Sequence, residues 1–391
     1  MKLLKKIILI AANTLCVSLL VAAIFISSYF AGLLRSQHAA VDWRGESGER
    51  FAQVSVFVPE ADALAEDRIR SFRRTVDQQL VDASIEAPKE GRLWTDAYSA
   101  VGQLTVKSQR GSTSATAIGV GGDFFLFHPY YLLSGSYIYD DDLMKDRVVL
   151  DEELAWKLFG GTDLAGMKVM INNEPYHIAG VVRRESDFAS EKAGAGGAMI
   201  FVSYETLVSG GAATDASSVS SGKITCYEVA LPDPISGFAK ALMENNFPLG
   251  GGEVVENTGR FGIERMFSVI ESFGLRSMRV NGVIYPYWEN AARYLEDWSA
   301  LILMLSIIAA ICPLITLIWL AVRLKKYLNS RSHDIKAAVE RRADKITWVR
   351  YEKRLQKEQQ LTEVSPALDD FNIDSIVSEV LEENKSESIG E

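Results

Sequence analysis

Two long apolar runs without a charged side chain constrain this sequence more than any other feature. They extend from Ile7 to Leu34 and from Ser299 to Val322. A helix rises about 1.5 Å per residue, so about 20 apolar residues cross the hydrocarbon layer of a bilayer. The sequence therefore predicts membrane-spanning helices at residues 7–31 and 299–322, with a large domain at 35–297 between them.

The first run has an alternative interpretation as a cleaved signal peptide, with a cleavage site near Ala39 or Ala40. The apolar core of a signal peptide is only about 7–15 residues long, whereas this run is much longer. We therefore favour an uncleaved anchor that follows a short cytoplasmic segment at residues 1–6.

The charges that flank the two runs predict their orientation. Three lysines precede the first run, and residues 323–358 hold twelve Lys or Arg against five Asp or Glu. Basic flanks stay on the cytoplasmic side of a membrane. We expect both termini in the cytoplasm and the large domain outside the cell membrane.

Aromatic and basic residues around the second run mark candidate contacts. Aromatic rings near the ends of a span favour the headgroup layer, which predicts interfacial roles for Trp288, Trp298, Trp319 and Tyr327. The basic segment at 323–358 is predicted to be helical, and it either contacts anionic lipids or docks onto a partner ATPase. Its candidate docking residues are Arg323, Lys325, Lys326 and Arg331.

The remaining tail, residues 359–391, is acidic and is predicted to be mostly disordered. It holds one lysine against nine acidic residues. Its apolar residues would share one helical face, which predicts either a segment that folds on a partner or marginal residual helix. These residues are Ile373, Ile376, Val377, Val380 and Leu381.

Composition excludes several classes of function. The net charge of −10 argues against binding to nucleic acid, which needs clustered basic residues. Cys226 is the one cysteine of the large domain, so an internal disulfide cannot form there. We expect a buried, inert thiol rather than an intermolecular bridge.

Motifs that carry catalytic chemistry are missing from the sequence. The run from Gly161 to Lys168 lacks the Gly-Lys-Ser/Thr ending of a phosphate-binding loop, and the serine-hydrolase, zinc-protease and Cys-x-x-Cys motifs do not occur. His128, which lies between aromatic residues and Pro129, is typical of a packed histidine. Asp140–Asp142 is typical of a solvated turn rather than a calcium site. We expect no catalytic residue, no cofactor and no metal.

Local periodicity predicts an α+β domain outside the membrane. A strand at 51–58, a helix at 61–83 and a strand at 93–106 favour a ferredoxin-like or split βαβ opening. Residues 233–257 repeat this helix and strand pattern. A hairpin turn is predicted at Asn172-Asn173.

Other stretches are predicted as connections. Small residues at 111–116 and 119–122 indicate turns, and residues 190–222 indicate two loops around one strand. Residues 261–297 are predicted to form a helical stalk that returns to the membrane.

Three stretches between residues 118 and 182 occur in a characteristic order: FFLFHPYYLLSGSYI, which a strand enters, then RVVLDEELAWKLFGG, then DLAGMKVMINNEPYHIAGVV. This order of features resembles the periplasmic core domain of MacB-type ABC transporter proteins, in the FtsX-related permease superfamily. The resemblance implies a porter-like βαβ subdomain with an inserted subdomain at about 140–225, placed directly after a first transmembrane helix.

The resemblance also implies a function. Permeases of this family have three further spans after the outer domain, whereas this sequence shows one. It therefore implies a non-enzymatic permease-like or accessory subunit of an ABC-type export or mechanotransmission complex in the cell membrane. Expected partners are the lipid bilayer, an ABC ATPase or other permease subunits, and an unknown extracytoplasmic cargo. The alternative is a membrane-anchored binding or scaffold protein without ATP coupling.

Overall fold

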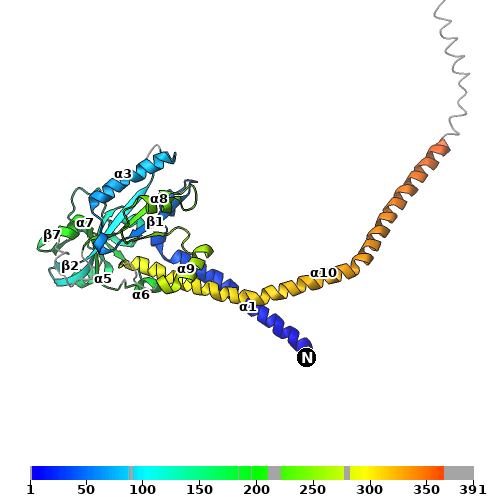
Figure 1. The fold of residues 1–391 in the computed structure, drawn as a ribbon, viewed down its shortest axis with the longest axis horizontal. Helices are drawn as coiled ribbons and strands as arrows, with labels where there is room; N and C mark the ends of the chain where they lie inside the picture. The colour runs from blue at the N-terminus through cyan, green and yellow to red at the C-terminus, as the bar shows by residue number, and fades with distance from the viewer. Residues whose placement is uncertain are drawn as a thin grey trace, which may run out of the picture. The chain divides into compact units, whose positions relative to one another are not determined.

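The computed structural model describes residues 2–364 except 87, 89–90, 184, 195, 210–221 and 277–281. The chain divides into two compact units, Met1–Ile311 and Cys312–Glu391. The first unit contains the mixed α/β domain that lies between the two apolar runs (Figure 1).

Helices and strands alternate irregularly along the chain. The helices are α1 (Lys2–Leu33), α2 (Ala39–Arg44), α3 (Glu66–Asp82), α4 (Phe124–Phe127), α5 (Glu152–Phe159), α6 (Phe188–Lys192), α7 (Tyr204–Ser209), α8 (Phe238–Asn246), α9 (Ile263–Arg276) and α10 (Tyr287–Val364), with 3-10 turns η1 (Arg35–Gln37) and η2 (Glu60–Asp62). The strands are β1 (Phe51–Phe57), β2 (Thr95–Ser108), β3 (Gly111–Gly122), β4 (Tyr131–Gly135), β5 (Arg147–Asp151), β6 (Lys168–Ile171), β7 (Glu174–Arg183), β8 (Met199–Ser203), β9 (Ile224–Pro232) and β10 (Glu253–Glu256).

Within the described residues the strands form one ten-stranded sheet in the order β10-β1-β9-β2-β3-β8-β5-β7-β4, and β6 pairs with β2 and β7. Strand β9 lies between β1 and β2, and it is antiparallel to both. Strand β1 lies between β9 and β10 in the same way. Helices α3 and α8 connect the two split pairs, so this half has the predicted ferredoxin-like βαβ arrangement.

The segment between β2 and β9 supplies the other half of the sheet. Strands β3, β8, β5, β7 and β4 all lie beyond β2, and they include two parallel pairs, β3 with β8 and β5 with β7. The insertion therefore extends the first sheet rather than building a separate one. The inserted segment begins with β3 at Gly111, earlier in the chain than the predicted range of about 140–225.

Apolar residues cover both faces of the sheet. Helices α3, α5, α7 and α8 pack on one face, where Phe72, Val76, Leu242 and Met243 are buried (Figure 1). Helices α2 and α4 and the first turn of α10 pack on the other face. This second face therefore joins the sheet to both long helices.

Several local predictions are confirmed. Strand β1, helix α3 and strand β2 follow the predicted βαβ order. Asn172 and Asn173 both have positive φ, 50° and 69°, as a two-residue hairpin turn between β6 and β7 needs. Cys226 is buried, and burial raises the pKa of its thiol well above the ordinary value.

The glycine-rich region after residue 110 differs from its prediction as two turns. Residues 111–122 form the continuous strand β3, which pairs with β2 along its whole length. A Cβ atom on Gly121 would lie 2.1 Å from the Tyr98 ring, and one on Gly119 would lie 2.6 Å from the Leu207 side chain. These glycines therefore let side chains approach the strand, which is a reason for glycine other than a turn.

The expected stalk at 261–297 is also corrected. It consists of two helices, α9 and α10, and residues 282–286 between them are not helical. Gly282 has a φ of 69°, and Pro286 precedes the first turn of α10. The predicted strand that leads into the FFLF stretch is β3, which ends at Gly122, and FFLF itself forms the short helix α4.

Among the residues that the structure describes, two helices are long and apolar enough to cross a membrane, at Leu3–Leu33 and within Tyr287–Ser330. Residues Phe30 and Leu34 at the end of the first pack against Ala291, Ala292 and Leu295 at the start of the second. The outer ends of the two apolar helices are thus in direct contact.

Candidate functional site

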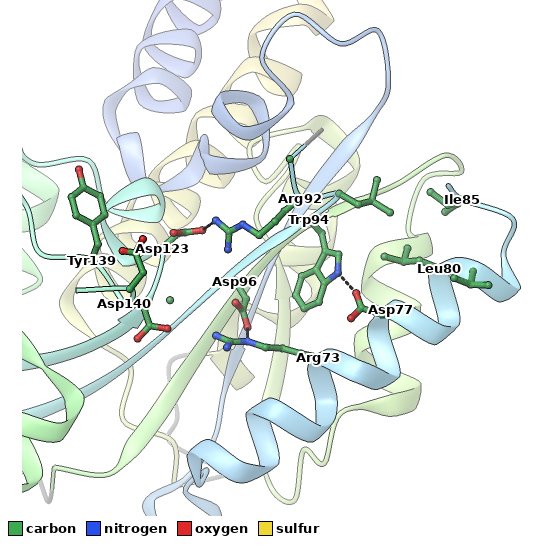
Figure 2. A pocket seen from close by; sticks show the side chains of 15 residues that line it. Arg73, Asp77, Leu80, Ile85, Arg92, Trp94, Asp96, Asp123, Tyr139 and Asp140 are labelled. Carbon is green, nitrogen blue, oxygen red and sulfur yellow. Dashed lines mark hydrogen bonds and ion pairs between the residues drawn. The ribbon is translucent and has the colours of Figure 1, made fainter. Parts of the chain in front are cut away.

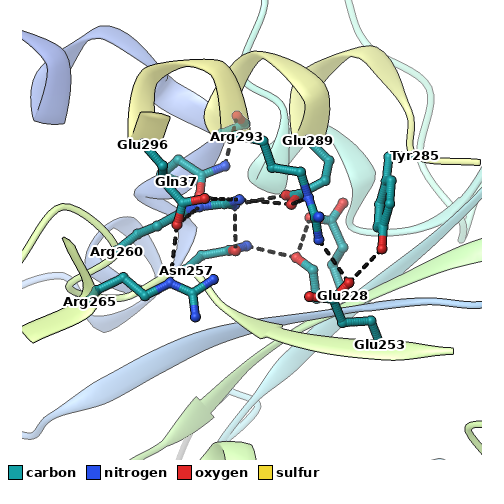
Figure 3. A network of polar contacts seen from close by, with 12 residues as sticks. Gln37, Glu228, Glu253, Asn257, Arg260, Arg265, Tyr285, Glu289, Arg293 and Glu296 are labelled. Carbon is teal, nitrogen blue, oxygen red and sulfur yellow. Dashed lines mark hydrogen bonds and ion pairs between the residues drawn. The ribbon is translucent and has the colours of Figure 1, made fainter. Parts of the chain in front are cut away.

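Arg260 lies at the centre of a buried polar network beneath the start of α10 (Figure 3). Its guanidinium donates to both carboxylate oxygens of Glu289 at 2.7 Å, and its Nε lies 3.1 Å from Oε1 of Glu296. The side chains of all three residues are at most 2% exposed. One guanidinium therefore holds two carboxylates that are seven residues apart on one side of α10.

Two further arginines balance the charge of this cluster. Arg293 of α10 donates to Glu289 at 2.7 Å and to Glu253 of β10 at 2.9 Å, and its guanidinium lies over the Tyr285 ring. Arg265 of α9 donates to Glu296 at 3.1 Å. The cluster thus contains three arginines and three glutamates, and it links α9, α10 and β10.

The electrostatics of the cluster favour its charged form. Burial acts to lower the pKa of Arg260, but the charges of Glu289 and Glu296 outweigh burial and hold that pKa above its ordinary value. The same balance of burial against Glu289 and Glu253 raises the pKa of Arg293. Removal of the arginines or of the glutamates would leave the opposite charges without partners in a site shielded from water, which is costly.

Hydrogen bonds extend the cluster across the sheet. Asn257 accepts from Arg260 at 3.3 Å and donates to Ser55 of β1 at 2.7 Å. The Ser55 hydroxyl donates to Glu228 of β9 at 3.0 Å, and the other oxygen of Glu228 lies 2.6 Å from Nε2 of His128. His128 is therefore a buried residue, as predicted, but it is paired with a buried carboxylate that the sequence did not indicate.

The network also reaches the segment that follows α1. Gln37 accepts from Arg260 at 3.3 Å. Gln53 of β1 donates to the Ser36 carbonyl at 2.7 Å and accepts from the Ala39 amide at 3.0 Å. Both apolar helices are consequently fixed at their outer ends to the same strands.

Trp288 corrects one predicted membrane contact. Its side chain is buried, 2% exposed, and its ring lies 4.5 Å from the His128 ring, centroid to centroid. It also packs edge-on against Phe124. Trp288 belongs to the core of the outer domain because α10 begins inside that core, and it cannot reach lipid headgroups.

The other predicted interface and docking residues lie along α10. Trp298, Trp319 and Tyr327 are exposed, and the guanidinium of Arg323 lies 5.1 Å from the Trp319 ring. Lys325 and Lys326 are exposed, and Arg331 lies in the same helix. Five predicted docking residues lie outside the described residues: Ile373, Ile376, Val377, Val380 and Leu381.

An open cleft forms a second candidate site, on the face of the sheet that α3 covers (Figure 2). It has a volume of about 920 Å³. Two arginines and five aspartates line it, so the lining carries a net charge of −3. These charged residues are Arg73, Asp77, Arg92, Asp96, Asp123, Asp140 and Asp141.

Both arginines of the cleft are already paired. Arg73 donates to Asp96 at 2.7 Å, and Arg92 donates to Asp123. Asp140 and Asp141 are exposed at the rim of the cleft. Lys145 lies 4.0 Å from Asp140, so the cleft offers a partly compensated excess of negative charge beside apolar side chains of α3.

Comparison with known proteins addresses the identity of the domain. The model of the family described as MacB-like periplasmic core domain matches residues 7–236, more than half of the chain. The chain belongs to this family. Its MacB-like domain thus follows the first apolar helix directly, as the sequence resemblance implied.

Solved structures include similar domains. The periplasmic region of MacB from Actinobacillus actinomycetemcomitans is 19% identical, with a TM-score of 0.36, over 56% of this chain and 92% of that one. The extracellular domain of the noncanonic ABC-type transporter YknZ from Gram-positive bacteria is 15% identical, with a TM-score of 0.34, over 52% of this chain and 99% of that one. No curated protein matches the sequence.

Proposed function

We propose that this MacB-like protein is a non-enzymatic, permease-like or accessory membrane subunit of an ABC-type export or mechanotransmission complex. Family membership supports the relation to ABC transporter permeases. In this proposal any ATP hydrolysis resides in a partner subunit, in keeping with a sequence that shows no phosphate-binding loop. Both termini lie in the cytoplasm in this proposal, because both flanks on that side are basic.

The buried Arg260 network is the observation that carries the proposal. Glu289, Arg293 and Glu296 lie on one side of α10, and their partners are Arg260, Arg265 of α9 and Glu253 of β10. Arg260 in turn donates to Gln37, which follows α1. Ion pairs of this kind resist separation, because breaking one leaves a buried charge without its partner. A displacement of α10 along or across the membrane would therefore move the sheet with it.

The cytoplasmic part of α10 provides the inner end of this connection. The helix continues beyond the apolar run to Val364, and its exposed basic residues include Lys325 and Lys326. In the proposed complex this segment docks onto an ABC ATPase. The acidic cleft of the outer domain supports a contact with a basic cargo or partner on the other side of the membrane.

Crosslinked affinity purification from native membranes, followed by mass spectrometry, tests the proposal. The full chain should recover an ABC ATPase together with a fuller permease. Deletion of residues 323–391 should abolish this recovery. Deletion of residues 365–391 alone is the matched control, and it shows whether the basic helix or the acidic tail makes the contact.

One result would contradict the proposed coupling to ATP hydrolysis. If the full chain recovers only envelope proteins and no nucleotide-binding subunit, ATP coupling is wrong. The protein would then be a membrane-anchored scaffold that reuses the MacB-like fold.

A further inference from the structure

Helix α9 has an apolar side of which α10 covers only a part. Met266 and Val269 are buried against Ala300 of α10, and the partly buried Leu303 belongs to the same cluster. Arg265 fixes the start of α9 to α10 through Glu296 (Figure 3). Helix α9 is therefore held along the first turns of the second apolar run.

The rest of this apolar side faces outward. Ile263 is 68% exposed, Phe267 is 50% exposed and Phe273 is 56% exposed. At 100° per residue these three side chains and the buried Met266 lie within one apolar sector of about 120°, and Val269 lies at its edge towards α10. Glu264 and Glu271 are exposed at the edge of this sector, past Phe267. A domain surrounded by water rarely exposes such a group of large apolar side chains without a contact for them.

The position of the contact on α10 identifies the occupant. Ala300 and Leu303 lie one and four residues after Ser299, where the uncharged run begins, so they lie roughly 1.5–6 Å along the span at 1.5 Å per residue. Interfacial helices bury their apolar side about 5–10 Å into the boundary between headgroups and acyl chains. Leu301, Met304 and Leu305 at the same level of α10 are also exposed, as expected for a helix that enters lipid.

We propose that α9 lies in the bilayer interface, where Ile263, Phe267 and Phe273 contact acyl chains. Helix α9 would then be a third membrane contact of the chain, in addition to the two spans. This inference rests on the proposed position of the spans in the bilayer. Helix α9 carries two glutamates and two arginines, so its insertion does not need anionic lipid. The occupant is the lipid bilayer itself, rather than a protein groove.

Site-specific fluorescence in reconstituted full-length protein tests this inference. Cys16, Cys226 and Cys312 are first replaced by alanine, and single cysteines are then introduced and labelled with an environment-sensitive dye in phosphatidylcholine vesicles. The test variants are Phe267→Cys and Phe273→Cys, and the matched controls on the polar side of α9 are Glu264→Cys and Glu271→Cys. Leu305→Cys reports the span, and Val81→Cys on α3 reports water.

Lipids that carry a quencher in the acyl chain should quench the labels at Phe267→Cys and Phe273→Cys as they quench Leu305→Cys. Both cysteines should react with a water-soluble maleimide about tenfold more slowly than Glu264→Cys, because burial of a phenylalanine-sized apolar group favours the lipid phase by more than this factor. Vesicles with added anionic lipid should give the same quenching.

Three results would overturn the inference in distinguishable ways. Lipid quenching at Leu305→Cys with water accessibility at both phenylalanine positions removes α9 from the membrane and leaves the spans in place. Protection of both positions from lipid and water alike shows that a protein surface, or a second copy of the chain, is the occupant. Water accessibility at Leu305→Cys overturns the membrane placement itself, and with it the proposed function.

Discussion

At the residue scale, Arg260 is enclosed with two carboxylates that water does not reach. Replacement by methionine in Arg260→Met keeps much of the side-chain volume but leaves Glu289 and Glu296 as buried charges with fewer partners. We expect this variant to lose about 3–5 kcal/mol in free energy of unfolding, the usual cost of breaking a buried pair from one side. Denaturant unfolding of the full-length protein in detergent measures the loss.

An exposed arginine supplies the control for Arg260. Arg70 pairs with Asp67 on the surface of α3, where both side chains are mostly exposed. Arg70→Met should leave stability unchanged within error, because exposed ion pairs add little. If both arginine variants unfold alike, the Arg260 network does not hold the outer domain together.

Two glutamates of β10 predict opposite effects of pH on stability. Burial acts to raise the pKa of Glu253, but Arg293 and the Tyr285 hydroxyl outweigh it and hold that pKa below the ordinary 4.5. Burial and the charge of Asp233 hold the pKa of Glu256 above 4.5. Glu253 therefore adds stability above pH 4.5 that is lost as pH falls through its folded-state pKa. Glu256 adds stability below pH 4.5 that is lost as pH rises through its folded-state pKa.

Substitution of each glutamate by glutamine isolates these effects. Glu253→Gln should lower the melting temperature at neutral pH and lose this difference in acid. Glu256→Gln should raise the melting temperature at neutral pH relative to the parent and lose that gain below pH 4.5. Melting curves from pH 3 to 8 provide the measurement, and parallel curves for the two variants would contradict the assignment.

At the scale of elements, the close approach of Tyr98 to strand β3 predicts that Gly121 cannot be replaced without a loss of stability. A Cβ atom on Gly121 would lie 2.1 Å from the Tyr98 ring, which is closer than van der Waals contact allows. Gly121→Ala should destabilise the domain by about 1–3 kcal/mol through overpacking. Gly161→Ala is the control, since nothing lies within 4 Å of its Cβ position. Equal unfolding midpoints for the two variants would show that the sheet yields at this point.

Strand β3 also shows where prediction from the sequence reached its limit. Periodic apolar residues and turn signals were sufficient for β1, α3, α8 and the Asn172-Asn173 hairpin. They failed for β3, because glycine suits both a turn and a strand that neighbouring side chains approach closely. The break between α9 and α10 was missed because apolar residues on both sides continue the helical pattern.

The sequence predicted less of the polar network than of the fold. Its members lie far apart in the chain: Gln37 is 223 residues from Arg260, and His128 is 100 residues from Glu228. Only the long-range pairing of β1, β9 and β10 brings them together. The spacing of Glu289, Arg293 and Glu296 was a usable signal, since it places three charges on one side of the first turns of α10.

At the scale of the whole molecule, the charge on each flank of the spans predicts orientation. An epitope attached after Glu391 should resist protease added outside intact cells, because the basic segment 323–358 holds this end in the cytoplasm. An epitope inserted at the exposed Gly48 of the outer domain should be removed under the same conditions. Digestion of the terminal epitope in intact cells would reverse the proposed orientation.

The chain returns from the insertion into β9 beside the middle of β2. Ala100 pairs with Ile224, and the Gly222 amide donates to the Val101 carbonyl at 3.2 Å. The four strands β10, β1, β9 and β2 are therefore already contiguous without it. The segment between these two points nevertheless packs on both membrane helices, through Phe188 against Phe30 and through Phe124 against Trp288. Its length and loops can therefore vary during evolution only where these two contacts are kept, so the insertion and the membrane anchors must diverge together.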